Sequence, residues 1–172
     1  RQGRRSGMDF DTKADIEAPL AWVFKQATDF AAFERQAMRR GADVQRVDRL
    51  DHPGPGSAWD VQFRFRGRDR LVNVRLTRFD PPHGYDVDMD SANLHGTMQV
   101  ELVALSRVRT RLAVRLALDA HSLQARILLQ SLRLARGQIA RRFDTRMAAF
   151  ALDLQNRYAR RPGATAGARP GE

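Results

Sequence analysis

Four histidines are the first residues to consider for metal or acid–base chemistry: His52, His83, His95 and His121. They are far apart in the sequence, and none has a second histidine or a carboxylate at the spacing that a metal site uses. Each lies in or near a predicted turn, or at an outward position of a predicted strand. We interpret them as solvated histidines, and the sequence predicts no metal site.

Three aspartates at alternate positions, Asp86, Asp88 and Asp90, resemble the start of a calcium-binding loop. Such a loop needs glycine at its sixth position and glutamate at its twelfth. Those positions hold Ser91 and Thr97. The aspartates alternate with apolar residues, which is typical of the solvent-facing side of a strand. We therefore expect no calcium here.

Other signatures of catalysis are missing from the sequence. It has no cysteine, which excludes disulfides, thiolate metal sites and cysteine nucleophiles. It has no phosphate-binding loop, dinucleotide glycine fingerprint, nucleophile elbow or Ser-x-x-Lys sequence. Gly54 and Gly56 stand among prolines, a composition typical of a turn. The sequence predicts no catalytic residue and no cofactor, and it favours a protein that is not an enzyme.

The chain of 172 residues carries a net charge of +10, which raises the possibility of nucleic-acid binding. Almost all the positive charge is arginine, since Lys13 and Lys25 are the only lysines, and the arginines are dispersed. We therefore expect no specific nucleic-acid partner. No apolar run approaches the roughly 18 residues of a membrane span, and no secretory signal follows the basic start. These features and the missing cysteines predict a cytoplasmic protein.

The elements that would position a site lie within one predicted domain, residues 8–161, between disordered tails at 1–7 and 162–172. Alternating apolar residues predict a first strand over 10–16. Pro19 suits the first turn of a helix. Asp29 then caps a second short helix that ends at Gly41.

Six more strands follow, each alternating between apolar and polar residues. We expect them around residues 42–50, 59–66, 72–77, 85–90, 98–102 and 111–118. One apolar and one polar face on successive short strands indicate an antiparallel sheet covered on one side. The prediction is an α+β domain.

A long amphipathic helix is predicted to cover the apolar face. Its apolar residues recur every three or four positions: Leu132, Ala135, Ile139, Phe143, Met147, Phe150, Leu154 and Tyr158. A helix over 132–160 would be about 40 Å long, enough to cross the sheet. Residues 127–129 predict a separate helical turn, and Gly137 a local bend.

The inward residues of the strands and the facing residues of the helices predict the lining of a hollow. They are Phe33, Trp59, Val61, Phe63, Val74, Tyr85, Met89, Met98, Val100, Phe143 and Met147. Phe65 shares the inward face by the same alternation. The hydroxyl of Tyr85 and the ring nitrogen of Trp59 are the only obvious hydrogen-bonding groups. A lining of this kind suits binding better than bond-making.

Four stretches of the sequence resemble the START-like superfamily, also called SRPBCC. They are "IEAPLAWVFKQATDFAAFE" from Ile16, "GSAWDVQFRFRGR" from Gly56, "FDPPHGYDVDM" from Phe79 and "ARILLQSLRLARGQIARRFDTRMAAFALDLQNR" from Ala125. The resemblance covers roughly residues 8–160. It implies the helix-grip fold: a curved antiparallel sheet of about six to seven strands wrapped around a long C-terminal helix, with two short helices after the first strand.

The resemblance also implies a cavity for a small hydrophobic molecule such as a lipid, polyketide or quinone. Three functions stay open: a binding or carrier protein, a polyketide-cyclase-like or dehydratase-like enzyme using the same cavity, and a basic module for anionic lipid surfaces or nucleic acid. A strand bulge that turned Asn93, His95 or Arg64 inward would favour the enzyme. An exposed edge strand would allow a homodimer as well as a monomer.

Overall fold

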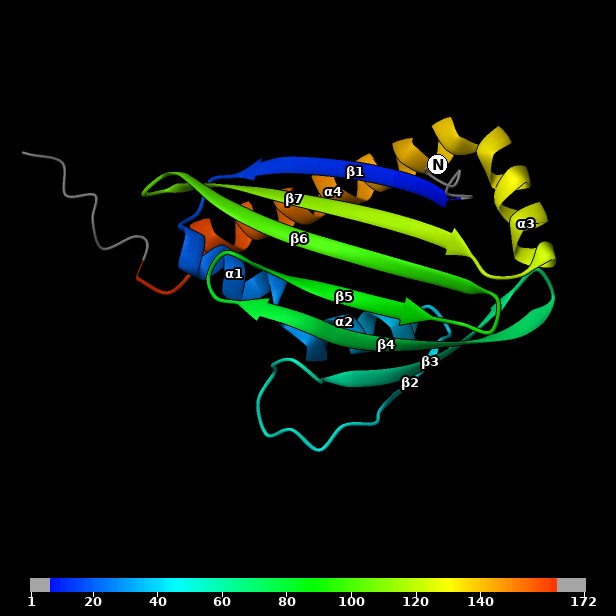
Figure 1. The fold of residues 1–172 in the computed structure, drawn as a ribbon. Coiled ribbons are helices and arrows are strands. Elements are labelled where there is room, and N and C mark those ends of the chain that lie inside the picture. Colours follow the sequence, from blue (N-terminus) through cyan, green and yellow to red (C-terminus); the bar gives the residue numbers. More distant parts are fainter. Residues whose placement is uncertain (1–6, 164–172) are drawn as a thin grey trace, which may run out of the picture.

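The alternating stretches form a seven-stranded antiparallel sheet in the computed structural model, which describes residues 7–163 (Figure 1). The strands are β1 (Gly7–Ile16), β2 (Asp43–Arg46), β3 (Ala58–Phe65), β4 (Arg68–Asp80), β5 (Gly84–Asp90), β6 (Leu94–Ser106) and β7 (Arg109–Ala120). Their order across the sheet is β1-β7-β6-β5-β4-β3-β2. The first strand therefore pairs with the last, and the strands between them form a meander.

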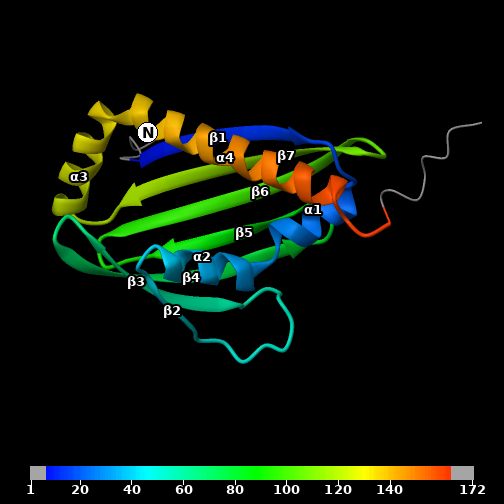
Figure 2. The ribbon, with the colours of Figure 1, turned by 180° about the vertical axis from the view of Figure 1, so that it is seen from behind.

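Four helices accompany the sheet in the described part of the chain: α1 (Leu20–Ala27), α2 (Phe30–Arg39), α3 (Leu123–Leu134) and α4 (Arg136–Ala159). Figure 2 shows α1, α2 and α4 on one face of the sheet, with α3 at one end of it. The predicted α+β helix-grip architecture, with two short helices after the first strand and a long C-terminal helix, is confirmed.

The prediction of one helix over 132–160 is wrong in its boundaries. Two helices meet at Ala135, whose φ of −100° and ψ of 11° interrupt the helical backbone. Ser122 caps α3 by accepting a hydrogen bond from the Ala125 N–H at 3.1 Å. Leu129 is buried in a small core of its own, apart from the main core under α4. The chain therefore breaks between the two cores, and the predicted turn at 127–129 belongs to a helix of twelve residues.

The predicted strand over 42–50 is also shorter than expected, because the carboxylate of Asp48 turns the chain away from the sheet. This carboxylate accepts hydrogen bonds at 2.8 Å from Arg46 Nε and from the backbone N–H groups of Leu50 and Ala58. Its side chain is only 6% exposed. The hydrogen bond from Arg46 holds the pKa of Asp48 well below its usual range. The hydrogen bonds of one buried carboxylate thus stabilise the loop between β2 and β3.

We expect Asp48→Asn to lower the free energy of unfolding by about 2 kcal/mol at pH 7, since it weakens charge-assisted hydrogen bonds at a buried site. A depressed carboxyl pKa stabilises the fold above the ordinary value of 3.8 and loses that effect as the pH falls below it. The difference from the wild type in urea unfolding should therefore be constant above about pH 5 and shrink as the pH falls below about 4. Asp51→Asn, at an exposed position in the same loop, is the control. Equal unfolding curves for both variants would contradict this role.

A few residues of the two predicted tails lie within the described part of the chain. Gly7, predicted to lie in the N-terminal tail, is the first residue of β1. After α4 ends at Ala159 the chain continues as a turn to Gly163. The rest of the two predicted tails, residues 1–6 and 164–172, lies outside the described residues. Within residues 7–163, no helix has the length and apolar character needed to cross a membrane.

The main core is solid where the C-terminal half of α4 meets α1 and the sheet. Ile16, Val23 and Leu154 are completely buried there. The ring of Trp22 on α1 packs edge-on against Tyr158 on α4, with 5.0 Å between the ring centroids. This end fixes α4 against the sheet, whereas α2 and α4 run apart farther along (Figure 2).

Candidate ligand-binding cavity

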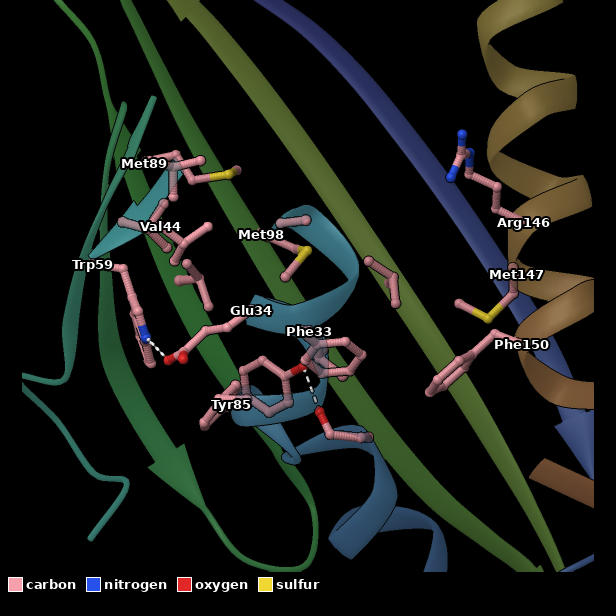
Figure 3. Close-up of a pocket in the computed structure, with 18 of the residues that line it drawn as sticks. Phe33, Glu34, Val44, Trp59, Tyr85, Met89, Met98, Arg146, Met147 and Phe150 are labelled. Carbon is pink, nitrogen blue, oxygen red and sulfur yellow. Dashed lines mark hydrogen bonds between the residues drawn. The ribbon is translucent and has the colours of Figure 1, made fainter. Parts of the chain in front are cut away.

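A hollow of about 450 Å³ lies between the inward face of the sheet, α2 and α4 (Figure 3). The side chains around it are almost all apolar. Strands β2 to β7 form its floor, and Phe33 and Phe150 approach each other from the two helices, with 6.3 Å between their ring centroids. The hollow is partly open to solvent, so water reaches its apolar wall. An apolar molecule that displaced this water would gain free energy from the hydrophobic effect.

Ten of the eleven predicted lining residues lie in the wall of the hollow. They are Phe33, Trp59, Val61, Val74, Tyr85, Met89, Met98, Val100, Phe143 and Met147. The alternation of the strands accounts for most of them, because every second residue of β3 to β6 faces the helices. Whether they contact a ligand stays a prediction.

Phe63 is the exception, and Phe65, on the same predicted face, is 42% exposed. Both lie near the free end of the β3–β4 hairpin. The pairing of β3 with β2 ends at Gln62, and the pairing of β4 with β5 does not extend beyond Asn73. The hairpin therefore projects past the strands that form the floor. The alternation correctly predicts the face of β3 on which Phe63 lies, but the hollow does not extend to this end of the strand.

Tyr85 is in the wall, but its hydroxyl is already used. It donates a hydrogen bond of 2.8 Å to the carbonyl oxygen of Ala27 at the end of α1. Burial raises the pKa of the Tyr85 phenol, which therefore stays protonated. We infer that this hydroxyl positions α1 on the sheet rather than serving as a free donor to a ligand.

Glu34 is an acidic residue in the wall that was not predicted from the sequence. Its Oε1 accepts a hydrogen bond of 2.5 Å from the Trp59 ring nitrogen, and Oε2 accepts none from the described residues. Arg46 lies over the Trp59 ring, 5.6 Å from its centroid. Glu34 follows Phe30 by four residues, so the two side chains lie on the same side of α2. This spacing is the sequence signal that could have identified Glu34.

Arg146 on α4 is the second charged residue in the wall that sequence reasoning did not find. It precedes Met147 and lies beside the predicted apolar stripe. Figure 3 shows its side chain on the α4 side of the hollow, opposite Glu34 and Trp59. The wall thus carries one acid and one base on opposite sides.

Two of the histidines, which are far apart in the sequence, lie close together in the fold. The rings of His95 and His121 have their centroids 5.9 Å apart, and His95 Nδ1 is 2.5 Å from Asp90 Oδ1. His95 pairs with both Asp90 and Asp119 in the sheet, which brings the start of β6 beside the end of β7. Residues 7–163 contain no group of three side chains that could hold a metal ion. His95 and Asn93 are not in the wall, and neither is Arg64.

The hydrogen bond to Asp90 raises the pKa of His95, with smaller contributions from Asp88 and Asp119. A raised histidine pKa stabilises the fold below the unfolded value near 6.5 and loses that effect as the pH rises through the folded value. We expect thermal stability to fall above pH 6.5, by less than about 1 kcal/mol because Asp90 is exposed. His95→Gln should flatten this slope, whereas His52→Gln in an exposed loop should not. An unchanged slope in His95→Gln would contradict the assignment.

The sequence matches no protein-family model and no curated protein. The ZhuI aromatase/cyclase from Streptomyces sp. R1128 superposes with a TM-score of 0.63 at 12% identity, over 95% of this chain and 99% of that one. A START superfamily protein from Mycobacterium smegmatis gives 0.54 at 11% identity, over 83% and 98%. Ara h 8.0201 gives 0.52 at 15% identity, over 68% and 80%.

The chain has the START-like helix-grip fold. The fold expected from the four sequence stretches is therefore confirmed. At these low identities the START-like neighbours establish the fold alone, because one fold hosts many functions. The function has to be argued from the wall of the hollow.

Proposed function

We propose that this START-like protein binds or carries a small hydrophobic molecule in the hollow between the sheet, α2 and α4. The observation that supports the proposal is the apolar wall of the hollow. Among the described residues that form this wall, only Glu34 and Arg146 are charged. Burial of about 300 Å² of apolar ligand surface would contribute roughly 7 kcal/mol before the costs of association. That is enough for useful affinity without many polar contacts.

The volume limits the size of the ligand. At the roughly 30 Å³ that a water molecule occupies in the liquid, about 450 Å³ accommodates on the order of 15 groups of that size. A medium-length alkyl chain or a molecule of two or three fused rings fits this space.

A cytoplasmic location and the choice between monomer and homodimer remain predictions from the sequence.

Native mass spectrometry of the protein, purified without added ligand, tests the proposal. We expect a fraction of the protein to carry the extra mass of a hydrophobic molecule, and organic extraction to release that molecule. Bare protein alone, together with no saturable binding of any apolar probe, would count against a ligand-binding function.

A second candidate is the cyclase-like or dehydratase-like enzyme, and Glu34 is the observation that favours it. A carboxylate in an apolar wall, fixed by Trp59 through one oxygen, has its other oxygen available to accept a proton. The aromatase/cyclase with the same fold makes a poly-β-ketone substrate the natural choice for an assay. Formation of an aromatic product by the wild type, and its loss in Glu34→Gln, would establish the enzyme. A product formed equally by both would exclude this role for Glu34.

A further inference from the structure

A second, polar depression adjoins the hollow between the end of α2 and the first half of α4. It is lined by Arg40, Gln138, Arg141, Arg142, Thr145 and Arg146. Arg146 lines both the depression and the hollow, so the two adjoin at that residue. We call its four arginines, Arg40, Arg141, Arg142 and Arg146, the arginine rim.

The arginine rim is unpaired among the residues that the structure describes. None of its four guanidinium groups forms an ion pair within 4.0 Å with a carboxylate of residues 7–163. On the outer face of the sheet, in contrast, Arg109 and Arg111 both bind Asp15. Like charges that gather without counter-charges repel one another, and a bound anion would relieve that repulsion. Gln138 and Thr145 supply uncharged donors at the same place.

The charged residues in the wall of the hollow also favour one orientation of a charged ligand. Glu34 lies on the side of Trp59, and Arg146 lies across the hollow on α4 (Figure 3). A ligand with one negative end would be repelled by Glu34 and attracted by Arg146. Its apolar body would then lie over the strands and its charged end would lie at the rim.

We propose that the occupant of the hollow is an amphipathic anion, whose carboxylate or phosphate is bound by the arginine rim while its apolar body fills the hollow. This inference rests on the proposed binding function and adds the chemical class and the orientation of the ligand. The guanidinium groups form charge-assisted hydrogen bonds to the anionic oxygens, and Glu34 excludes the opposite orientation.

Calorimetric titration at low salt with three probes of equal chain length, decanoate, decyl phosphate and decanol, tests this inference. We expect the wild type to bind at least one of the two anions about tenfold more tightly than the alcohol. The variant Arg40→Gln/Arg141→Gln/Arg142→Gln leaves the wall residue Arg146 in place. Its affinity for that anion should fall about tenfold, and its affinity for decanol less than about twofold. The control Arg64→Gln/Arg75→Gln/Arg115→Gln removes the same charge from strand positions outside the wall and should behave as the wild type.

The outcomes separate the inference from the function on which it rests. If the wild type prefers decanoate alone and the preference depends on the rim, the charged end of the ligand is a carboxylate. If it prefers decyl phosphate alone in the same way, the charged end is a phosphate. Either result supports the inference. Equal binding of all three probes, unchanged in the rim variant, overturns the inference and leaves the hollow as a binding site. An equal loss of decanol and anions in the rim variant also overturns it, since the arginines would then act on the shape of the hollow. Binding of no probe by the wild type overturns both proposals.

Discussion

The double variant Val74→Trp/Val114→Trp is expected to bind decanol at least about 100-fold more weakly than the wild type and to remain folded. Val74 on β4 and Val114 on β7 both lie in the wall of the hollow. Two indole rings in place of two isopropyl groups would occupy the space that the alkyl chain needs. A loss of 100-fold corresponds to about 2.7 kcal/mol, well below the gross gain from burying the ligand.

The control variant carries the same rings on the opposite face of the same strands. Arg75→Trp/Ala113→Trp changes the residues next to Val74 and Val114, which point away from the hollow because strand residues alternate. We expect this control to bind decanol as the wild type does. Both variants are to be checked by circular dichroism and thermal unfolding before titration. Unimpaired binding by the inner variant would show that decanol binds elsewhere.

Leu154→Ala is expected to lower the free energy of unfolding by about 3–4 kcal/mol, a large share of the stability of a domain of this size. Leu154 is 0% exposed and lies in the main core, where α4 meets α1 and the sheet. Its truncation would leave a cavity at the point that fixes α4. Urea unfolding followed by circular dichroism measures the change.

The same helix provides a matched comparison, since Leu152 is 57% exposed two residues earlier. We expect Leu152→Ala to change the free energy of unfolding by less than about 0.5 kcal/mol. The two substitutions remove the same atoms from the same helix, so their difference reports burial against the sheet. Similar effects for both would contradict the packing of α4 described above.

The sequence predicted the sheet and most of the wall because both depend on a local period. Trp59 and Val61 alternate with polar neighbours, and this alternation fixes their face without knowledge of the rest of the chain. The helix break at Ala135 was not predictable in the same way. The apolar stripe continues in phase through it, and only the separate small core around Leu129 reveals why the helix ends.

The charged part of the site depends on contacts between distant elements. The position of Glu34 on the apolar side of α2 was predictable, but its hydrogen bond with Trp59 was not, because Trp59 is 25 residues away in the sequence. The arginine rim joins Arg40 at the end of α2 to residues of α4 near position 141. Each of these arginines alone resembles an ordinary solvated residue. Their common position becomes visible only when the two helices are placed over the sheet.

Calorimetric titration of the wild type with decanol, repeated at several temperatures, is the most direct test of the hollow as a binding site. We expect saturable binding of about one molecule per chain, with a negative heat-capacity change from buried apolar surface. This binding should be lost in Val74→Trp/Val114→Trp. No saturable heat, or binding that the filled variant retains in full, would contradict it.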